Sequence, residues 1–292
     1  MRRNIVILGL SVAFLSSCAL AQNNGLRSPA APPTTTQQDI YCSGIFTTEH
    51  VPHDIEVVSG EEANYTVTFA EGAYVYINRG SDKGVKAGDT FLVMRPVSNE
   101  THLDFFTWQD RLMRAMGQAW EDEGRLKVVV AHKGVSIAQV TDACGYLQRG
   151  DVVLPFAERP APPLKREVNF DRFAPPSGKK KAMIVVAKGF TMQAGTDNIV
   201  YVNLGAGQGV KVGDYFRIYR HEDNGNSTVY QTSDMGTAVE GYGSAPDHYS
   251  WKDLPREIVG EGVVLRTSPN SSTVLITYSL KQIYDGDYCE IE

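Results

Sequence analysis

Five carboxylates near the middle of the chain have the right chemistry for acid–base catalysis. Hydrolysis of a glycosidic bond needs two carboxyl groups that face each other across a cleft, one to protonate the leaving oxygen and one to assist the attack. The five residues are Asp104, Asp110, Glu121, Asp122 and Glu123. They lie around one amphipathic stretch, so a charge-rich, solvated helix exit is a simpler interpretation than a catalytic pair.

A second group has the donor atoms of a metal site. His50 and His53, with Cys42 and Glu49, offer nitrogen, sulfur and oxygen ligands. A His-x-x-His pair in a loop beside a proline lacks the helix or strand that fixes ligand geometry, so two exposed histidines are the simpler interpretation. Neither a Gly-x-Ser-x-Gly elbow nor a His-Glu-x-x-His motif occurs. We therefore expect no catalytic residue, no bound metal and no cofactor.

The elements that must position these residues come from a duplication. Residues 74–95 recur as residues 199–220 at a constant offset of 125. Repeats of this kind indicate two copies of one structural module rather than one large enzyme fold. The shared positions include Asn78/Asn203, Gly80/Gly205, Gly84/Gly209, Val85/Val210, Gly88/Gly213, Asp89/Asp214 and Phe91/Phe216.

A later match has a larger offset. Residues 135–143 align with residues 271–279, and Gly150-Asp151 aligns with Gly286-Asp287, both at an offset of 136. Residues must therefore be inserted between the two matched blocks of the second copy. Each module is predicted to be a barrel-like core with a variable excursion in its middle.

The repeated motif Gly-x-x-x-Gly-Val-Lys-x-Gly-Asp lies between two short runs of β-branched and aromatic residues, which predict strands. Glycines permit positive φ, and an aspartate can accept bonds from nearby amides in a tight turn. A dinucleotide-binding loop would need a helix to follow, whereas a strand pattern follows. We predict a structural turn in each module, made by Gly84, Val85, Gly88 and Asp89, and by Gly209, Val210, Gly213 and Asp214.

This pattern, followed by Val259-Gly260-Glu261, Ser272-Thr273-Val274 and Gly286-Asp287, resembles the C-terminal domain of flagellar assembly protein T and related envelope modules. The first module matches less fully. The resemblance implies an SH3-like β-barrel and an envelope setting, but no flagellar role. The expected fold is mainly β, with two tandem small SH3-like β-barrel modules, the first with a helical insertion.

The N-terminus predicts export. Residues 1–21 have the charge and short apolar run of a signal peptide, too short for a membrane span of roughly 20 residues. Two cleavage sites compete: a lipobox at 15–18, which would acylate Cys18, and a small-x-small site before Gln22. The remaining divisions are a disordered tether at 22–40, module 1 at 41–157, a Pro-rich linker at 158–181 and module 2 at 182–292.

The two excursions offer candidate binding surfaces. Helical spacing predicts an amphipathic helix over residues 103–120, with Trp108 and Trp120 on faces roughly 120° apart, so that one is available to a partner. Residues 221–257 are rich in Gly, Asn and Ser and predict an irregular loop. Tyr249 and Trp251 are its candidate partner-binding residues. The alternative in both excursions is that the aromatic residues cover the module's own core.

The net charge restricts the possible class of partner, and the cysteine content restricts the possible disulfides. The formal net charge of −6 argues against nucleic acid, because phosphate binding needs a basic surface. Apart from Cys18 there are three cysteines, so at most one intramolecular disulfide forms in an oxidising compartment. Cys42 and Cys144 fall near the two ends of module 1 and are the preferred pair. Cys289 lies on a predicted strand and is predicted to be a small core residue.

Together these patterns predict a non-catalytic, exported envelope protein that acts as a scaffold or binding module in a cell-surface assembly. It would be periplasmic or anchored to the outer membrane, touching the membrane only through a lipid anchor. Its partner would be an envelope protein or a cell-wall polymer. The alternative is an exported hydrolase acting on cell-wall glycan with the carboxylates of residues 104–123.

Overall fold

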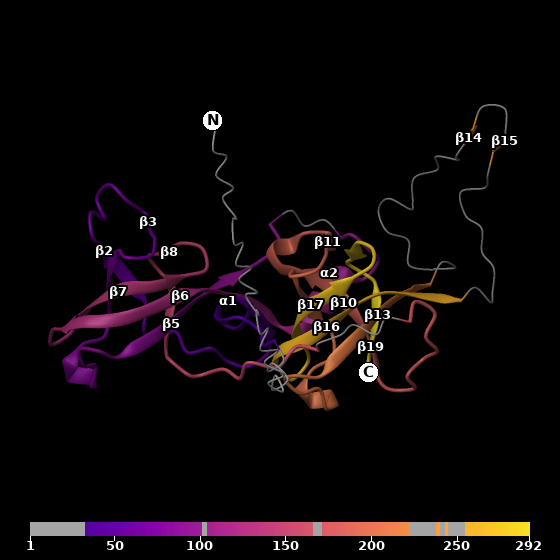
Figure 1. The fold of residues 1–292 in the computed structure, drawn as a ribbon. Helices are drawn as coiled ribbons and strands as arrows, with labels where there is room; N and C mark the ends of the chain where they lie inside the picture. Colours follow the sequence, from indigo (N-terminus) through magenta and orange to yellow (C-terminus); the bar gives the residue numbers. More distant parts are fainter. Residues whose placement is uncertain (1–32, 101–103, 166–170, 222–237, 240–242, 245–254) are drawn as a thin grey trace, which may run out of the picture. The chain divides into compact units, whose positions relative to one another are not determined.

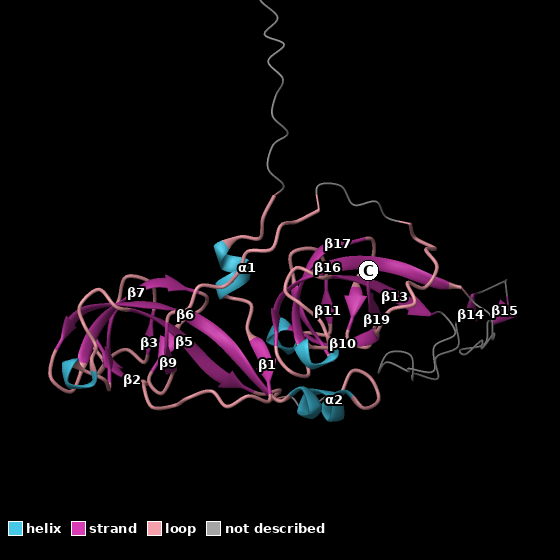
Figure 2. Ribbon diagram, turned by 90° about the horizontal axis from the view of Figure 1, so that it is seen from below, coloured by secondary structure: helices cyan, strands magenta, loops and turns pink. Residues whose placement is uncertain are grey.

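The structure is a computed structural model that describes residues 33–100, 104–165, 171–221, 238–239, 243–244 and 255–292. Pro32–Glu292 forms one compact unit. The protein is mainly β: in Figure 2 the described chain is almost entirely strand and loop, with α1 (Gln37–Tyr41) and α2 (Gln109–Met116) as short helices.

The first half of this unit folds into a seven-stranded antiparallel sheet (Figure 1). Six strands follow the order β2 (Val57–Gly60), β4 (Tyr74–Ile77), β7 (Ser136–Ala143), β6 (Gln118–Ala131), β5 (Thr90–Val97) and β9 (Val152–Pro155). Strand β1 (Ile45–Thr47) adds to the start of β6. A separate pair joins β3 (Thr68–Phe69) to β8 (Leu147–Gln148).

The second half is a closed six-stranded barrel. Its order is β10 (Lys181–Ala187), β12 (Ile199–Val202), β17 (Ser272–Ser279), β16 (Arg256–Thr267), β13 (Tyr215–His221) and β19 (Tyr288–Ile291). Strand β11 (Gln193–Ala194) pairs with β18 (Ile283–Tyr284), and β14 (Ala238–Val239) pairs with β15 (Gly243–Ser244).

The two halves have the same strand order, strand for strand, as a duplication requires. They differ in closure. In the second half β10 and β19 pair over three residues, whereas in the first half β2 and β9 meet only at the bridge between Glu56 and Val152. Backbone bonds of 2.9 Å from Val57 N to Asp151 O and 2.8 Å from Val153 N to Ile55 O flank this bridge.

Each half has its own apolar core. Inward side chains of alternating residues fill the first sheet, among them Val75, Ile77, Leu126 and Val140. Phe216, Ile218, Val264 and Ile276 do the same in the second barrel, where the Cys289 thiol is also fully buried. Val85 and Val210, the valines of the repeated turn, are buried in these two cores.

The repeated glycine motif forms the same turn twice. In each copy a short 3-10 helix, η1 (Ser81–Lys83) or η3 (Ala206–Gln208), ends at a glycine in the left-handed region. Two glycines of each turn have φ between 87° and 94°: Gly84 and Gly88 in the first copy, and Gly209 and Gly213 in the second. Such φ values favour glycine because a Cβ would crowd the following carbonyl oxygen.

The aspartate of the motif closes the turn in both copies. Asp89 Oδ2 accepts a 2.8 Å hydrogen bond from Lys86 N, and Asp214 Oδ2 accepts one of 2.8 Å from Lys211 N. The motif therefore acts through its backbone, as an aspartate turn between paired strands does.

The predicted helix over residues 103–120 is wrong in its extent. Helix α2 ends at Met116, because Gly117 has φ 103° and its absent Cβ would lie 2.2 Å from Thr47 O. The chain then enters strand β6 at Gln118. The apolar spacing that continues to Trp120 belongs to a strand and not to the helix.

The predicted tether and linker are also wrong where they are described. From residue 33 the chain is packed: Ile40 is buried, and Thr36 caps α1. Arg159 is bonded to Asp122, and Ala174 is buried on the second barrel. The described parts of both segments therefore pack on the rest of the protein rather than forming an isolated polyproline spacer. Residues 22–32 of the predicted tether lie outside the described residues.

The two halves share a buried apolar interface. Phe46 of β1, Met113 and Met116 of α2 and Ala119 of β6 pack in one cluster with strands of the second barrel. The barrel side of this cluster consists of Val185, Val186, Ile199, Tyr201, Val263, Leu265 and Leu275. The two modules are therefore joined by a core rather than strung on a linker.

Candidate functional site

Helix α2 positions the most exposed tryptophan of the described residues. Trp108 is its N-cap, with φ 78° and 64% of its surface exposed. The guanidinium of Arg111 lies over its ring, 5.7 Å from the centroid. A bulky side chain in the left-handed region is strained by about 1–3 kcal/mol, and such strain persists only where the surroundings enforce it.

Contacts from α2 to the second barrel enforce this conformation. The Gln109 side chain is buried; its Nε2 donates to Val185 O at 2.8 Å and to Asp285 Oδ2 at 2.9 Å. Phe106 is buried against Gly286, where an added Cβ would come within 3.2 Å of its ring. The start of α2 is thus held on both sides of Trp108. We call these contacts of Phe106 and Gln109 with Gly286, Val185 and Asp285 the clamp.

The acid in this clamp is unusual. Asp285 is 2% exposed and also accepts a 3.0 Å bond from Ala187 N. Burial raises the pKa of Asp285 to about 8, although the bonds from Gln109 and Ala187 act in the opposite direction. The clamp therefore contains a carboxyl group that is protonated over much of the neutral range.

A hollow of about 410 Å³ lies along the other flank of α2. Phe46, Val97, Met113 and Phe190 are among its apolar lining residues. Asp104, Asp110 and Arg114 supply charges at its wall, and Asp110 forms an ion pair with Arg114. Helix α2 thus has an exposed aromatic residue at its start and a hollow along its side.

The five carboxylates of the sequence do not converge on one cleft. Asp104 and Asp110 line the α2 hollow, while Glu121 lines a different one beside Lys188, at 3.9 Å. Asp122 and Glu123 are buried in strand β6. The arrangement therefore brings together only the first two.

Asp122 is held by cations from two other segments. Its carboxylate accepts bonds from Arg159 at 2.8 Å and from Arg266 at 3.1 Å, and from Gly44 N at 2.9 Å. Burial alone would raise the pKa of Asp122, but the two guanidiniums outweigh it and hold that pKa below its usual value. This residue fastens the first sheet to the second barrel.

Glu123 is the other buried acid of β6. Arg95 Nη1 lies 3.0 Å from it, and burial raises the pKa of Glu123 to about 7 against the opposing charge of Arg95. The same arginine is bonded to Asp151 at 2.7 Å. Glu123 thus belongs to a structural ion-pair group at the end of the first sheet.

Two arginine–aspartate pairs were missed by sequence reasoning. Arg95 binds Asp151, and Arg220 binds Asp287 at 2.7 Å in the second barrel. Each aspartate also accepts a backbone bond, from Gln148 N or Tyr284 N. The sequence did contain a signal for these pairs: both arginines are the last residues of the matched blocks, and both aspartates belong to the repeated Gly-Asp. Gln109 and Asp285 have no such counterpart.

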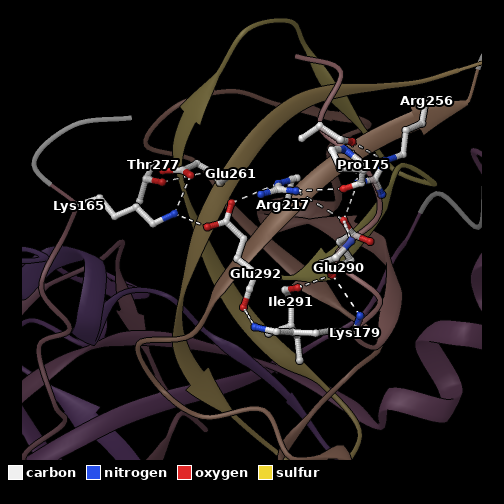
Figure 3. Close-up of polar contacts among 12 residues, drawn as sticks. Lys165, Pro175, Lys179, Arg217, Arg256, Glu261, Thr277, Glu290, Ile291 and Glu292 are labelled. Atoms are coloured by element: carbon white, nitrogen blue, oxygen red, sulfur yellow. Dashed lines mark hydrogen bonds and ion pairs between the residues drawn. The ribbon is translucent and has the colours of Figure 1, made fainter. Parts of the chain in front are cut away.

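A polar network fastens Lys165 and residues 171–181 to the second barrel (Figure 3). Glu290 is fully buried and accepts bonds from Arg256 at 2.7 Å and from Ser177 N at 3.0 Å. Lys165 Nζ lies 3.0 Å from Glu261 and also pairs with Glu292. These contacts have an architectural role, since they hold the predicted linker on the barrel wall.

Trp120, the other candidate tryptophan, is buried and not available at the surface. It lies on β6, is 4% exposed and packs with Ile45, Met94 and Val152, because strand alternation turns it inward. Tyr249, Trp251 and the acylation candidate Cys18 lie outside the described residues.

The Cys42 side chain forms a disulfide with Cys144, the pair preferred from sequence. His50 and His53 have ring centroids 6.2 Å apart, and His53 packs against Trp120. Within the described ranges no group of three or more His, Cys, Asp or Glu is placed to hold a metal ion. The described helices include none with the length and apolarity to span a membrane.

Comparisons with protein-family models and with curated proteins found no match to this chain.

Proposed function

We propose that this chain is a non-catalytic scaffold or binding protein of the bacterial cell envelope that recognises an envelope protein or cell-wall polymer through the surface of α2. The proposal includes export, by acylation at Cys18 or by cleavage before Gln22. It also includes the finer fold assignment of two tandem SH3-like barrels, similar to the C-terminal domain of flagellar assembly protein T.

The exposed, strained Trp108 carries the proposal. An aromatic ring on the surface offers a large contact area to a protein side chain or a sugar ring, and tryptophan is enriched among residues that dominate binding. The clamp through Gln109 and Phe106 holds its backbone before any partner arrives, so little ordering entropy is lost on binding. Strain at an exposed side chain is the pattern expected of a functional residue.

Replacing Trp108 by glycine separates a binding role from a structural one. Glycine relieves the positive φ, so Trp108→Gly should raise the free energy of unfolding by about 1 kcal/mol. The same change should weaken binding to solubilised envelope proteins or purified cell wall at least about tenfold. Tyr65→Ser is the matched control, because Tyr65 is 90% exposed on a different loop. Unchanged binding by Trp108→Gly would contradict the proposal.

The hydrolase alternative rests on one observation: Asp104 and Asp110 line the same hollow. Purified protein and the Asp104/Asp110/Glu121 triple alanine variant should be incubated with purified cell wall while released sugars are measured. We expect no turnover by either protein. Robust turnover that the triple variant loses would overturn the scaffold proposal in favour of the hydrolase.

A further inference from the structure

The two halves correspond residue by residue on their outer faces. Ser59 pairs with Tyr76 in the first sheet as Val186 pairs with Tyr201 in the second barrel, each next to a register shift. Strand β6 pairs with β7 as β16 pairs with β17, again with a shift at the same place. Val58 therefore corresponds to Val185, Val129 to Leu265, and Val130 to Arg266.

On the second barrel this outer face is covered by the first half. Val185 and Leu265 are 0% and 1% exposed. Phe46 packs on Tyr201 with ring centroids 5.0 Å apart, and the Tyr201 hydroxyl donates to Ser43 O at 2.9 Å. The covering elements include β1, which runs along the start of β6.

On the first sheet the corresponding face is open. Val58, Val129 and Val130 are 43%, 45% and 41% exposed. Tyr76, at the place of Tyr201, and Ile137 beside it are only half-buried. The first module thus has an open copy of the face that the second barrel uses to bind the first half. We call this open face, with Val58, Val129 and Val130, the receiving face.

The second module presents the covering side. Arg172 O accepts a bond from Ile258 N, so residues 172–175 run beside β16 as the β1 segment runs beside β6. Buried Ala174 takes the place of Ile45. Ile45 packs with Met94 and Val152, and Ala174 packs with their counterparts Tyr219 and Tyr288. Phe173 and Pro175 then lie on the outward side, as Phe46 does, and both are exposed.

The charges change in a matching way. Within the chain the interface contains the ion pair of Asp122 with Arg266. The corresponding residues are Ile258, which is buried beside Ala174, and Val130 on the open face of the first sheet, so both members of the pair are replaced by apolar residues. A buried charge without a partner would oppose association, and neither Ile258 nor Val130 carries one. The receiving face does carry one charged residue elsewhere, because exposed Lys127 takes the place of buried Val263. Pro175 stands at the position of Phe46, and the outward aromatic ring of this segment lies one alternation earlier, at Phe173. We therefore expect the segment to contact the receiving face with a small shift along the strand.

We propose that the open face of the first sheet receives the 172–175 segment of a second copy of this chain, so that copies associate head to tail. Such an interface is heterologous and continues into short linear assemblies rather than closed dimers. The inference deepens the proposed scaffold role and rests on it, because a repeating assembly is what a scaffold would provide.

The test is sedimentation of the full chain carrying Cys18→Ser, which removes the acylation site, over roughly a hundredfold concentration range. The unaltered interface should give dimers and larger species as concentration rises. Val129→Lys on the receiving face and Phe173→Lys on the covering segment should each weaken self-association at least about tenfold. Both positions are exposed, and unchanged melting curves would verify folding.

Mixing the two variants gives the decisive result. Each keeps one intact half of a head-to-tail interface, so the mixture should form dimers and nothing larger. A monomer at every concentration, a mixture that stays monomeric, or a Phe173→Lys variant that still dimerises while Val129→Lys does not would each overturn the inference. Trp108→Ala should associate normally, so loss of partner binding by that variant tests the proposed function separately.

Discussion

Asp285 should make the stability of this protein fall as pH rises. Its folded-state pKa is about 8, whereas an unfolded aspartate titrates near 3.9. The folded state therefore binds the proton more tightly, and this stabilisation is complete below about pH 4 and lost as pH rises through about 8. Each unit between those limits is worth about 1.4 kcal/mol.

Asp285→Asn keeps the shape of the side chain and removes the titration. Between pH 5 and pH 8 the free energy of unfolding of the unaltered protein should fall by about 4 kcal/mol relative to that of the variant. Comparing the two proteins by urea unfolding at both pH values cancels the titration of Glu123 and every other shared group. Because the carboxyl lies at the α2 contact, a broadened or two-stage transition at pH 8 would further locate the effect there.

The control is Asp142→Asn, which removes a carboxylate that lies outside this contact and whose side chain is 57% exposed. A pH-independent difference between the unaltered protein and Asp285→Asn would refute the reasoning. It would mean that Asp285 is either ionised within the clamp or solvated in a way that its 2% exposure does not show.

Two further outcomes are expected. Gly88→Ala should lower the free energy of unfolding by about 1–2 kcal/mol, whereas Gly134→Ala should change it little. A Cβ at either site meets open space, and only Gly88 has a positive φ. Equal effects of the two substitutions in urea unfolding would contradict backbone strain at Gly88. Reduction of the Cys42–Cys144 disulfide, which spans 102 residues, should cost about 2–5 kcal/mol in a melting experiment; a Cys42→Ser variant should be insensitive to the reductant, and an unmoved transition of the unaltered protein would contradict the prediction.

The parts of the fold that sequence could predict are those encoded locally. The glycines and aspartates of the repeated motif specify a turn by themselves, and their recurrence indicated that one strand order would appear twice. The Cys42–Cys144 pair also followed from position within a module. Closure could not be predicted, because it depends on how far β2 and β9 overlap and not on any local pattern.

The parts that sequence missed depend on distant contacts. Gly117 ends α2 because Thr47, far away in the chain, occupies the space beside it. Trp120 has helical spacing relative to Met113 but strand geometry after that glycine. Gln109 and Asp285 are 176 residues apart and repeat nowhere, so no periodicity could reveal their bond. The Pro-rich segment 158–181 has little apolar content, yet the ion pairs of Lys165 and Arg172 and the buried Ala174 hold its described part on the barrel.

The central claim, that α2 presents a partner-binding surface in the cell envelope, is tested most directly by photocrosslinking in intact cells. A photoreactive amino acid at position 108 should yield a discrete crosslinked product in the envelope fraction. The same probe at Tyr65, which is more exposed than Trp108, should not yield that product. No product from position 108, or the same products from both positions, would contradict the account.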